Sequence, residues 1–223
     1  MVAASDNTPF RCPLVLVTGF EPFGDQQLNP SWMAAQALHG RMLGGHRIVA
    51  AQLPTSFGAA LETQRELLLR HRPVLAIGTG QAGGRAAISL ERVAINVNDA
   101  RIPDNSGAQP VDTPVIEGAP AAYFSTLPIK AMMAAMLGAG IAAEVSQTAG
   151  TFVCNHAFYG LMHELATVPR LHATRGGFIH VPWLPAQAAP SMPLDSLVAG
   201  LKVAIECALA THEDIRQEAG ALN

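Results

Sequence analysis

Short apolar runs alternate along the chain with longer segments in which apolar and polar residues mix. The apolar runs are rich in Val, Ile and Leu, which is typical of strands buried in a sheet, and they predict strands at residues 14–18, 46–53, 74–77, 88–97, 142–147 and 178–181. The mixed segments predict helices at residues 30–43, 57–71, 128–138, 154–168 and 194–217, the first of them capped by Asn29. Strands that alternate with helices favour right-handed crossovers and a mostly parallel sheet.

This order of elements predicts an α/β fold: a single three-layer α/β/α domain around a mostly parallel, twisted sheet, as in phosphorylases and hydrolases. The domain is expected to span residues 14–223, after a loosely ordered N-terminal extension at residues 1–13. In such sheets ligands bind where loops converge at the carboxyl ends of the strands. Candidate chemistry is therefore sought directly after Thr18, Ile77, Val97, Gln147 and Val181.

The composition is that of a globular protein with little net charge. Of 223 residues, 49% are hydrophobic, and 14 Lys and Arg stand against 17 Asp and Glu, for a formal charge of −3. No basic tract and no long apolar run is present, so we expect no nucleic-acid partner and no membrane partner. The three cysteines are widely spaced and odd in number, and the first residues lack a secretory pattern. We therefore expect free thiols and a cytoplasmic location.

The glycine-rich run Gly80–Arg85 follows a predicted strand but does not match a phosphate-binding loop. It lacks the Lys-Ser/Thr ending of such loops, and the segment after it is another predicted strand rather than a helix. We expect its glycines to permit close backbone approach to a small ligand, with Gln81 as a polar contact. Cys154, His156 and His163 form a weak metal-ligand pattern, and hydrogen-bonded or solvent-facing histidines are the favoured alternative.

Cys154 is the main candidate for a reactive group. It stands at the start of a predicted helix, where unpaired N–H groups and the positive end of the helix dipole favour a thiolate and can bind an oxyanion. The alternative is a buried and inert cysteine, which is common in cytosolic proteins. Cys12, near the chain start, and Cys207, inside a predicted helix, receive that second interpretation.

A cysteine nucleophile needs a base and a group that orients the base. His180 lies near the carboxyl end of a predicted strand, where a site is expected. Glu91 interrupts an apolar run, and such a charge is either paired with Arg92 at a sheet edge or directed at a site. Sequence spacing leaves that choice open.

Several stretches with distinctive residues follow one another along the chain: Thr18–Gly24, Asn29–Trp32, Gly80–Arg85, Glu91–Asn96, Ala100–Asn105, Thr148–His156 and Gly177–Pro182. Together they resemble the pyroglutamyl-peptidase I (pyrrolidone-carboxylate peptidase) family of cysteine peptidases. The resemblance covers nearly the whole chain, and the combination is far more specific than any one stretch.

The resemblance implies a catalytic role for three residues. Cys154 would be the nucleophile, His180 the general base and then acid, and Glu91 the carboxylate that orients the imidazole. It also implies that the backbone N–H of Cys154 and the side chain of Arg101 hold the oxyanion. No cofactor and no metal are implied.

The implied substrate is a peptide or protein with an N-terminal pyroglutamyl residue, whose flat, uncharged lactam needs apolar walls and a few hydrogen bonds. The resemblance assigns this pocket to Phe20, Phe23, Gln81, Phe152 and Val153. It further implies a homodimer or homotetramer. The alternatives are a catalytically inactive binding protein for a lactam or capped peptide, and another enzyme of related fold, such as an α/β hydrolase or a phosphorylase.

Overall fold

The structure is a computed structural model that describes residues 12–220, so residues 1–11 of the expected extension lie outside the described part. The strands are β1 (Leu14–Phe20), β2 (Met42–Leu43), β3 (His46–Leu53), β4 (Leu75–Gln81), β5 (Ile88–Glu91), β6 (Val93–Ile95), β7 (Ala122–Phe124), β8 (Ala143–Ser146) and β9 (Arg175–Val181). The helices are α1 (Pro30–Leu38), α2 (Phe57–His71), α3 (Ile129–Gly138), α4 (Val153–Thr167) and α5 (Leu194–Ala210), with a 3₁₀ turn at Pro169–Leu171.

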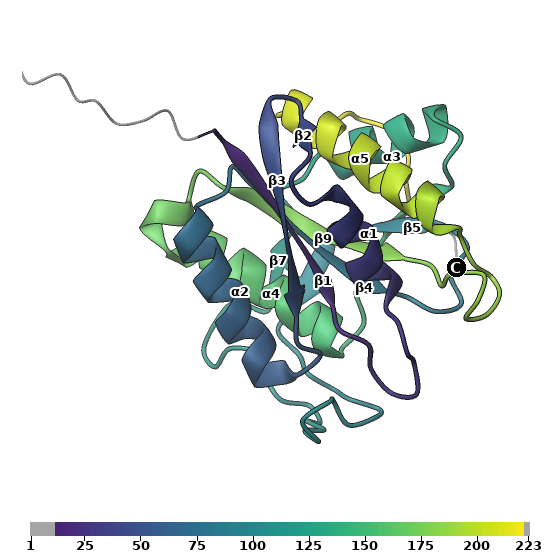
Figure 1. The fold of residues 1–223 in the computed structure, drawn as a ribbon. Coiled ribbons are helices and arrows are strands. Elements are labelled where there is room, and N and C mark those ends of the chain that lie inside the picture. Colours follow the sequence, from purple (N-terminus) through teal and green to yellow (C-terminus); the bar gives the residue numbers. More distant parts are fainter. Residues whose placement is uncertain (1–11, 221–223) are drawn as a thin grey trace, which may run out of the picture.

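The main sheet has the strand order β2-β3-β1-β4-β9-β5-β8. Strands β3, β1, β4 and β9 are parallel, β5 runs antiparallel to β9, and β8 is parallel to β5. Helices α2 and α4 cover one face of this sheet, while α1, α3 and α5 cover the other (Figure 1). This arrangement confirms the predicted three-layer α/β/α fold with a mostly parallel sheet.

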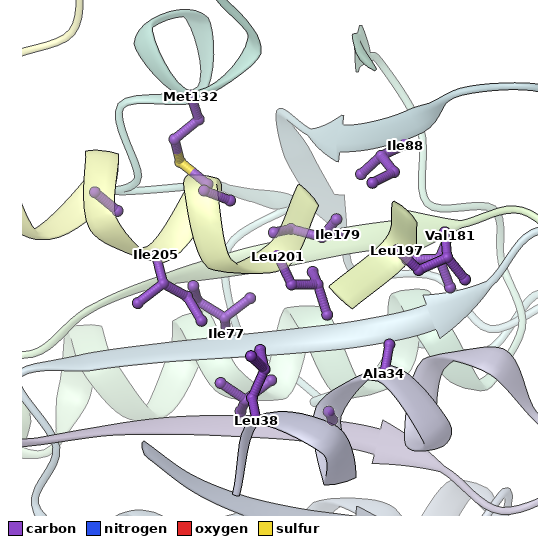
Figure 2. Close-up of a cluster of buried hydrophobic side chains, with 14 of the residues drawn as sticks. Ala34, Leu38, Ile77, Ile88, Met132, Ile179, Val181, Leu197, Leu201 and Ile205 are labelled. Atoms are coloured by element: carbon purple, nitrogen blue, oxygen red, sulfur yellow. The ribbon is translucent and has the colours of Figure 1, made fainter. Parts of the chain in front are cut away.

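Two hydrophobic cores, one on each face, hold the layers together. Figure 2 shows the first, in which Ile77 and Ile179 of the sheet meet Leu38 of α1 and Leu201 of α5. The second lies under α2 and α4 and contains Phe178. Burying one side chain such as Leu201, which is fully buried, stabilises a fold by about 1.5–3 kcal/mol.

Strand β9 serves both cores because successive side chains point to opposite faces of a sheet. Ile179 and Val181 belong to the core beneath α1 and α5, whereas Phe178 belongs to the core beneath α4. By the same alternation His180 is directed to the α4 side. The functional candidates on β9 and α4 therefore share one face of the sheet.

Several element boundaries differ from the sequence prediction. The helix expected at residues 30–43 ends at Leu38, because Gly40 has a positive φ of 77° and β2 then turns back to pair with β3. The strand expected at 88–97 divides at Arg92 into β5, which lies in the main sheet, and β6, which pairs with β7 in a separate small sheet.

The predicted end of the next strand, at a run of glycines, is wrong. The run Gly78–Gly80 was expected to end a strand, yet β4 continues through it to Gln81 and pairs with β9 over its whole length. Glycine is needed inside this strand, because a β-carbon at Gly78 would lie 2.5 Å from the ring of Phe178. The last helix is also shorter than the expected 194–217 and ends at Ala210.

Among the helices of residues 12–220, none combines the length and the apolar character that crossing a membrane requires.

Candidate active site

A cavity of about 470 Å³ opens at the carboxyl edge of the parallel strands. Its wall is mostly apolar and carries a small set of polar and charged groups, as small-molecule sites usually do. The lining residues are Phe20, Phe23, Asn29, Thr55, Gln81, Ala82, Gly83, Arg85, Arg101, Ala149, Gly150, Phe152, Val153, Cys154 and His180. The structure thus brings the nucleophile, base, oxyanion and pocket candidates to one cavity.

Cys154 lies in the first turn of α4, which begins at Val153. The first intrahelical hydrogen bond that the turn makes comes from His156 N–H, which donates to the carbonyl of Phe152. Backbone N–H groups before it have no helical acceptor and are directed toward the helix start. Arg101, an exposed side chain on the loop after β6, lines the same cavity. The site therefore contains both kinds of donor expected for an oxyanion.

The thiol of Cys154 is packed closely against the sheet. A β-carbon at Gly80 of β4 would lie only 2.7 Å from its Sγ atom, so the helix start and the strand approach more closely than any other residue would permit. The sequence predicted backbone approach to a small ligand at this glycine run, whereas the group close to Gly80 is the thiol. At Gly83 the approaching group is the ring of Trp183.

Burial raises the pKa of the Cys154 thiol to about 12, the negative charge of Glu91 raises it as well, and the positive charge of Arg85 opposes both. Burial therefore opposes the thiolate that the helix start favours. Desolvation of the charged form outweighs the helix dipole, because the dipole supplies only about 0.3–1 kcal/mol at most surface positions. A protonated thiol needs a base to accept its proton.

His180 and Glu91 form a buried pair on the strands next to Cys154. In the register of β5 against β9, Ser89 lies opposite His180 and Glu91 lies opposite Phe178. His180 and Glu91 are therefore diagonal neighbours on one face, within reach of long side chains. His180 Nδ1 lies 2.7 Å from Oε1 of Glu91, and the carboxylate is fully buried.

This pair decides how the two ring nitrogens of His180 can act. A buried carboxylate accepts, so Nδ1 carries the proton of that hydrogen bond. Nε2 is then the nitrogen left to exchange a proton in the cavity. Glu91 is thus directed at the site, which resolves the alternative left open by the sequence.

Arg85 is a partner of Glu91 that the sequence analysis did not single out. Its Nη1 donates to Oε1 of Glu91 at 2.8 Å, and its Nη2 donates to the carbonyl of Thr148 at 3.2 Å. Arg92, the neighbour proposed as a partner of Glu91, instead donates to Gln147 at 2.9 Å. Both arginines lie near Glu91 in the sequence. The turn after β4 brings Arg85, and not Arg92, into contact with the carboxylate.

Aromatic side chains form one wall of the cavity. Phe23 packs on Phe152 with ring centroids 6.1 Å apart, and Phe152 meets Phe57 edge to face at 5.4 Å. Phe20 and Val153 line the cavity but are also almost fully buried in the core, so the same side chains pack the core and form the cavity wall. These residues supply flat apolar surface.

Gln81 and the loops above it supply polar contacts. Oε1 of Gln81 accepts a hydrogen bond from Nε2 of Gln187 at 3.0 Å, which leaves the amide nitrogen of Gln81 as a donor toward the cavity. Oε1 of Glu21 accepts from the backbone N–H of Thr55 at 3.0 Å and from Nδ2 of Asn105 at 2.9 Å. This carboxylate joins three loops that carry the walls of the cavity.

The weak metal-ligand pattern does not form a site. Nδ1 of His156 lies 2.8 Å from Oδ1 of Asn98, and Nδ1 of His163 lies 3.0 Å from the hydroxyl of Tyr123. Within residues 12–220, no group of three His, Cys, Asp or Glu side chains is arranged to hold a metal ion. The favoured alternative of hydrogen-bonded histidines is correct for these two residues.

Comparison with known proteins decides the family. The sequence profile of the pyroglutamyl peptidase family matches residues 14–211. The chain belongs to the pyroglutamyl peptidase family. It is 59% identical to the pyrrolidone-carboxylate peptidase of Cupriavidus taiwanensis, over 95% of this chain and all of that protein. It is 52% identical to the enzyme of the same name from Bacillus cytotoxicus, over 90% of this chain and 95% of that protein.

Solved structures place the fold in the same family. Pyroglutamyl peptidase I of Bacillus amyloliquefaciens is 47% identical, superposes with a TM-score of 0.90, and is matched over 93% of this chain and 100% of its own. A mutant pyrrolidone carboxyl peptidase of Pyrococcus furiosus is 43% identical with a TM-score of 0.84, over 88% of this chain and 98% of its own. The resemblance stated from the short stretches is therefore confirmed.

Proposed function

We propose that this member of the pyroglutamyl peptidase family removes N-terminal pyroglutamyl residues from peptides by thiol catalysis. The observation that carries the proposal is the fully buried carboxylate of Glu91, 2.7 Å from Nδ1 of His180, in a cavity that Cys154 also lines. A cysteine, a histidine and an orienting carboxylate are the groups that nucleophilic acyl transfer requires. A protein that only binds a lactam needs none of them.

The first half of the reaction forms a thioester. Nε2 of His180 takes the thiol proton of Cys154 while Sγ attacks the carbonyl carbon of the pyroglutamyl residue, which gives a tetrahedral oxyanion. His180 then donates that proton to the leaving amine, the C–N bond breaks, and the acyl group stays on sulfur. Since burial keeps the free thiol protonated, this proton transfer is a necessary part of the attack.

The second half releases the product. His180 takes a proton from water, whose oxygen attacks the thioester carbon. The C–S bond then breaks to free pyroglutamate, and His180 returns the proton to the sulfur of Cys154. In both halves the oxyanion is held by the backbone N–H of Cys154 and by Arg101. Loss of one such donor typically lowers turnover by a factor of about 10²–10³.

The cavity accounts for selectivity toward a lactam. Phe23 and Phe152 offer flat apolar surface, Phe20 and Val153 lie at its base, and Gln81 offers a hydrogen bond. An ordinary N-terminus carries an ammonium group, which would lose its water in such a pocket without gaining a carboxylate partner. That penalty favours the uncharged ring.

We also propose that the protein acts in the cytoplasm as a homodimer or homotetramer. Its three cysteines are free thiols, which suits a reducing compartment. Met42, Val111 and Phe124 are large apolar side chains more than half exposed, which suits burial between subunits. Sedimentation velocity of the purified protein tests the assembly, and a monomer at micromolar concentration would contradict it.

The experiment is hydrolysis of a pyroglutamyl arylamide, compared with the matched prolyl and glutamyl arylamides. We expect release of the arylamine from the pyroglutamyl compound only, and complete loss of that release after thiol alkylation. Cys154→Ser and His180→Ala are expected to lower kcat/KM by a factor of about 10⁴ or more. Glu91→Gln is expected to retain measurable activity, because Glu91 orients the base and transfers no proton.

Cys207→Ser is the matched control, since it removes a thiol outside the cavity and should leave kcat/KM unchanged. Folded, reduced protein that hydrolyses none of the three compounds would contradict the proposal and favour the inactive binding protein. Hydrolysis that survives in Cys154→Ser would contradict the thiol mechanism alone.

A further inference from the structure

One carboxylate oxygen at the site is shared by two partners, the imidazole of His180 and the guanidinium of Arg85. Oε1 of Glu91 accepts from His180 at 2.7 Å and from the guanidinium of Arg85 at 2.8 Å. Oε2 of Glu91 is buried and has no hydrogen-bond partner among residues 12–220. The carboxylate is fully buried, whereas about a quarter of the Arg85 side chain is exposed. Oε1 therefore makes all the hydrogen bonds that the described residues donate to this carboxylate.

The charges of this cluster explain why two partners matter. A buried carboxylate with only an imidazole beside it favours the imidazolium strongly, and it also opposes a second negative charge on a nearby thiol. A histidine held as imidazolium before attack cannot accept the proton of Cys154. A permanent positive charge on the same oxygen offsets the charge of Glu91, and this lowers the cost of a negative charge on the nearby thiol.

We propose that Arg85 is a positioning residue for catalysis, which compensates the charge of Glu91 and thereby sets the protonation balance of the Cys154–His180 pair. The role rests on the proposed thiol function of that pair. Arg85 need not touch substrate, because it acts through Glu91. The opposing effects of Arg85 and Glu91 on the pKa of Cys154 agree with this role.

Other charged groups surround the pair but do not share this contact. Arg101 lines the cavity from the loop after β6, and Arg92 is bound to Gln147. On β8, Glu144 accepts a hydrogen bond from the hydroxyl of Ser89 at 2.7 Å. On α4, His156 is held by Asn98. Within residues 12–220, Arg85 is the arginine that makes an ion pair with Glu91.

Arg85 also has a structural contact that the test must separate from its charge. Its second nitrogen donates to the carbonyl of Thr148, next to Ala149 and Gly150 in the cavity wall. If this contact were its whole role, loss of Arg85 would loosen the wall and lower activity at every pH. A change in the charge balance instead moves the pH at which the thiol reacts.

The experiment measures the rate of Cys154 alkylation by iodoacetamide against pH, in a Cys12→Ser, Cys207→Ser background. This readout needs no turnover. We expect Arg85→Gln to shift the pH of half-maximal reactivity upward by about one unit, or roughly tenfold slower alkylation at a fixed lower pH. Arg85→Lys keeps a positive charge and is expected to recover much of the shift.

Arg92→Gln is the matched control, because it removes the same charge beside Glu91 in sequence but outside its contacts. A shift in Arg85→Gln no larger than in Arg92→Gln would overturn the inference, and so would an equal shift in Arg85→Lys and Arg85→Gln. If Arg85→Gln does not fold, comparison of Arg85→Lys with wild type decides, since an ammonium group cannot reproduce the two contacts of the guanidinium, to Glu91 and to Thr148, and should still give a smaller upward shift. The alkylation result is independent of the arylamide hydrolysis by the wild-type protein, which tests the proposed function.

Discussion

At the scale of single residues, the position of the Cys154 thiol requires that Gly80 has no side chain. Gly80 lies in β4 directly opposite His180, and the first turn of α4 packs Cys154 onto it. A β-carbon at Gly80 would meet Sγ of Cys154 at 2.7 Å and the ring of Phe178 at 2.9 Å. Neither neighbour can move freely, because the ring is in the core and the thiol is on a helix.

We therefore expect Gly80→Ala to lower kcat/KM for the pyroglutamyl arylamide by a factor of about 10², the usual cost of moving a reacting group by about 1 Å. Gly58→Ala is the matched control. Gly58 lies in α2 with no atom near its would-be β-carbon, so alanine there should keep activity and slightly favour the helix. Wild-type kcat/KM in Gly80→Ala would show that the thiol tolerates displacement.

At the scale of elements, an arginine from β9 caps the last helix. Helix α5 has no basic residue in its own last turn. Arg175, the first residue of β9, donates from Nη1 to the carbonyl of Thr211 at 2.7 Å and from Nη2 to the carbonyl of Ala208 at 2.5 Å. Carbonyls at a helix C-terminus need such donors. The end of α5 at Ala210 thus depends on a contact distant in the sequence.

Arg175→Met is expected to lower the free energy of unfolding by about 1.5–3 kcal/mol, the usual contribution of hydrogen bonds to a charged group. Urea unfolding measures it, and kcat/KM of the folded variant should match wild type because Arg175 is far from the cavity in the strand. Lys202→Met, on the same helix, should change stability by less than about 1 kcal/mol, since its contact with Glu206 is an exposed pair at 4.0 Å. Equal effects of the two variants would contradict the capping role.

At the scale of the whole molecule, a buried histidine couples stability to pH. His156 on α4 packs edge to face on Phe57 of α2 and lies 2.8 Å from Asn98 on the loop after β6. Its Nε2 atom is buried with no hydrogen-bond partner in the described part of the chain. Burial lowers the pKa of His156 to about 4, so the ring is neutral in the folded protein at neutral pH.

Because the folded pKa lies below the unfolded value of about 6.5, the contribution of His156 is complete above pH 6.5 and is lost as pH falls toward 4. Wild type is expected to lose up to about 3 kcal/mol in this window through His156 alone. His156→Gln cannot titrate there. The difference in unfolding free energy between the two proteins, measured at pH 7 and at pH 4.5, should therefore change in favour of the variant; a constant difference would contradict the assignment.

Much of the fold was determined by the sequence alone. Periodicity is a local property, so it predicted β3 and α2 with their full bounds and the alternation that makes a three-layer α/β/α fold. The carboxyl ends of parallel strands meet at one edge in such a fold, which is why Cys154 and His180 stand out as candidates in the sequence alone. The series of short motifs then identified the family, because their occurrence in this order is improbable by chance.

Contacts between distant residues were decided only by the tertiary structure. The register of β5 against β9 directs Glu91 to His180, and the turn after β4 gives that carboxylate Arg85 rather than its neighbour Arg92. Burial opposes the effect of the helix dipole on Cys154, and the sequence does not show this because desolvation depends on everything packed around a group. Periodicity in the sequence indicates which face of an element a side chain occupies. The charged partners of that side chain, its burial and its close contacts depend on the residues that other elements place against the same face.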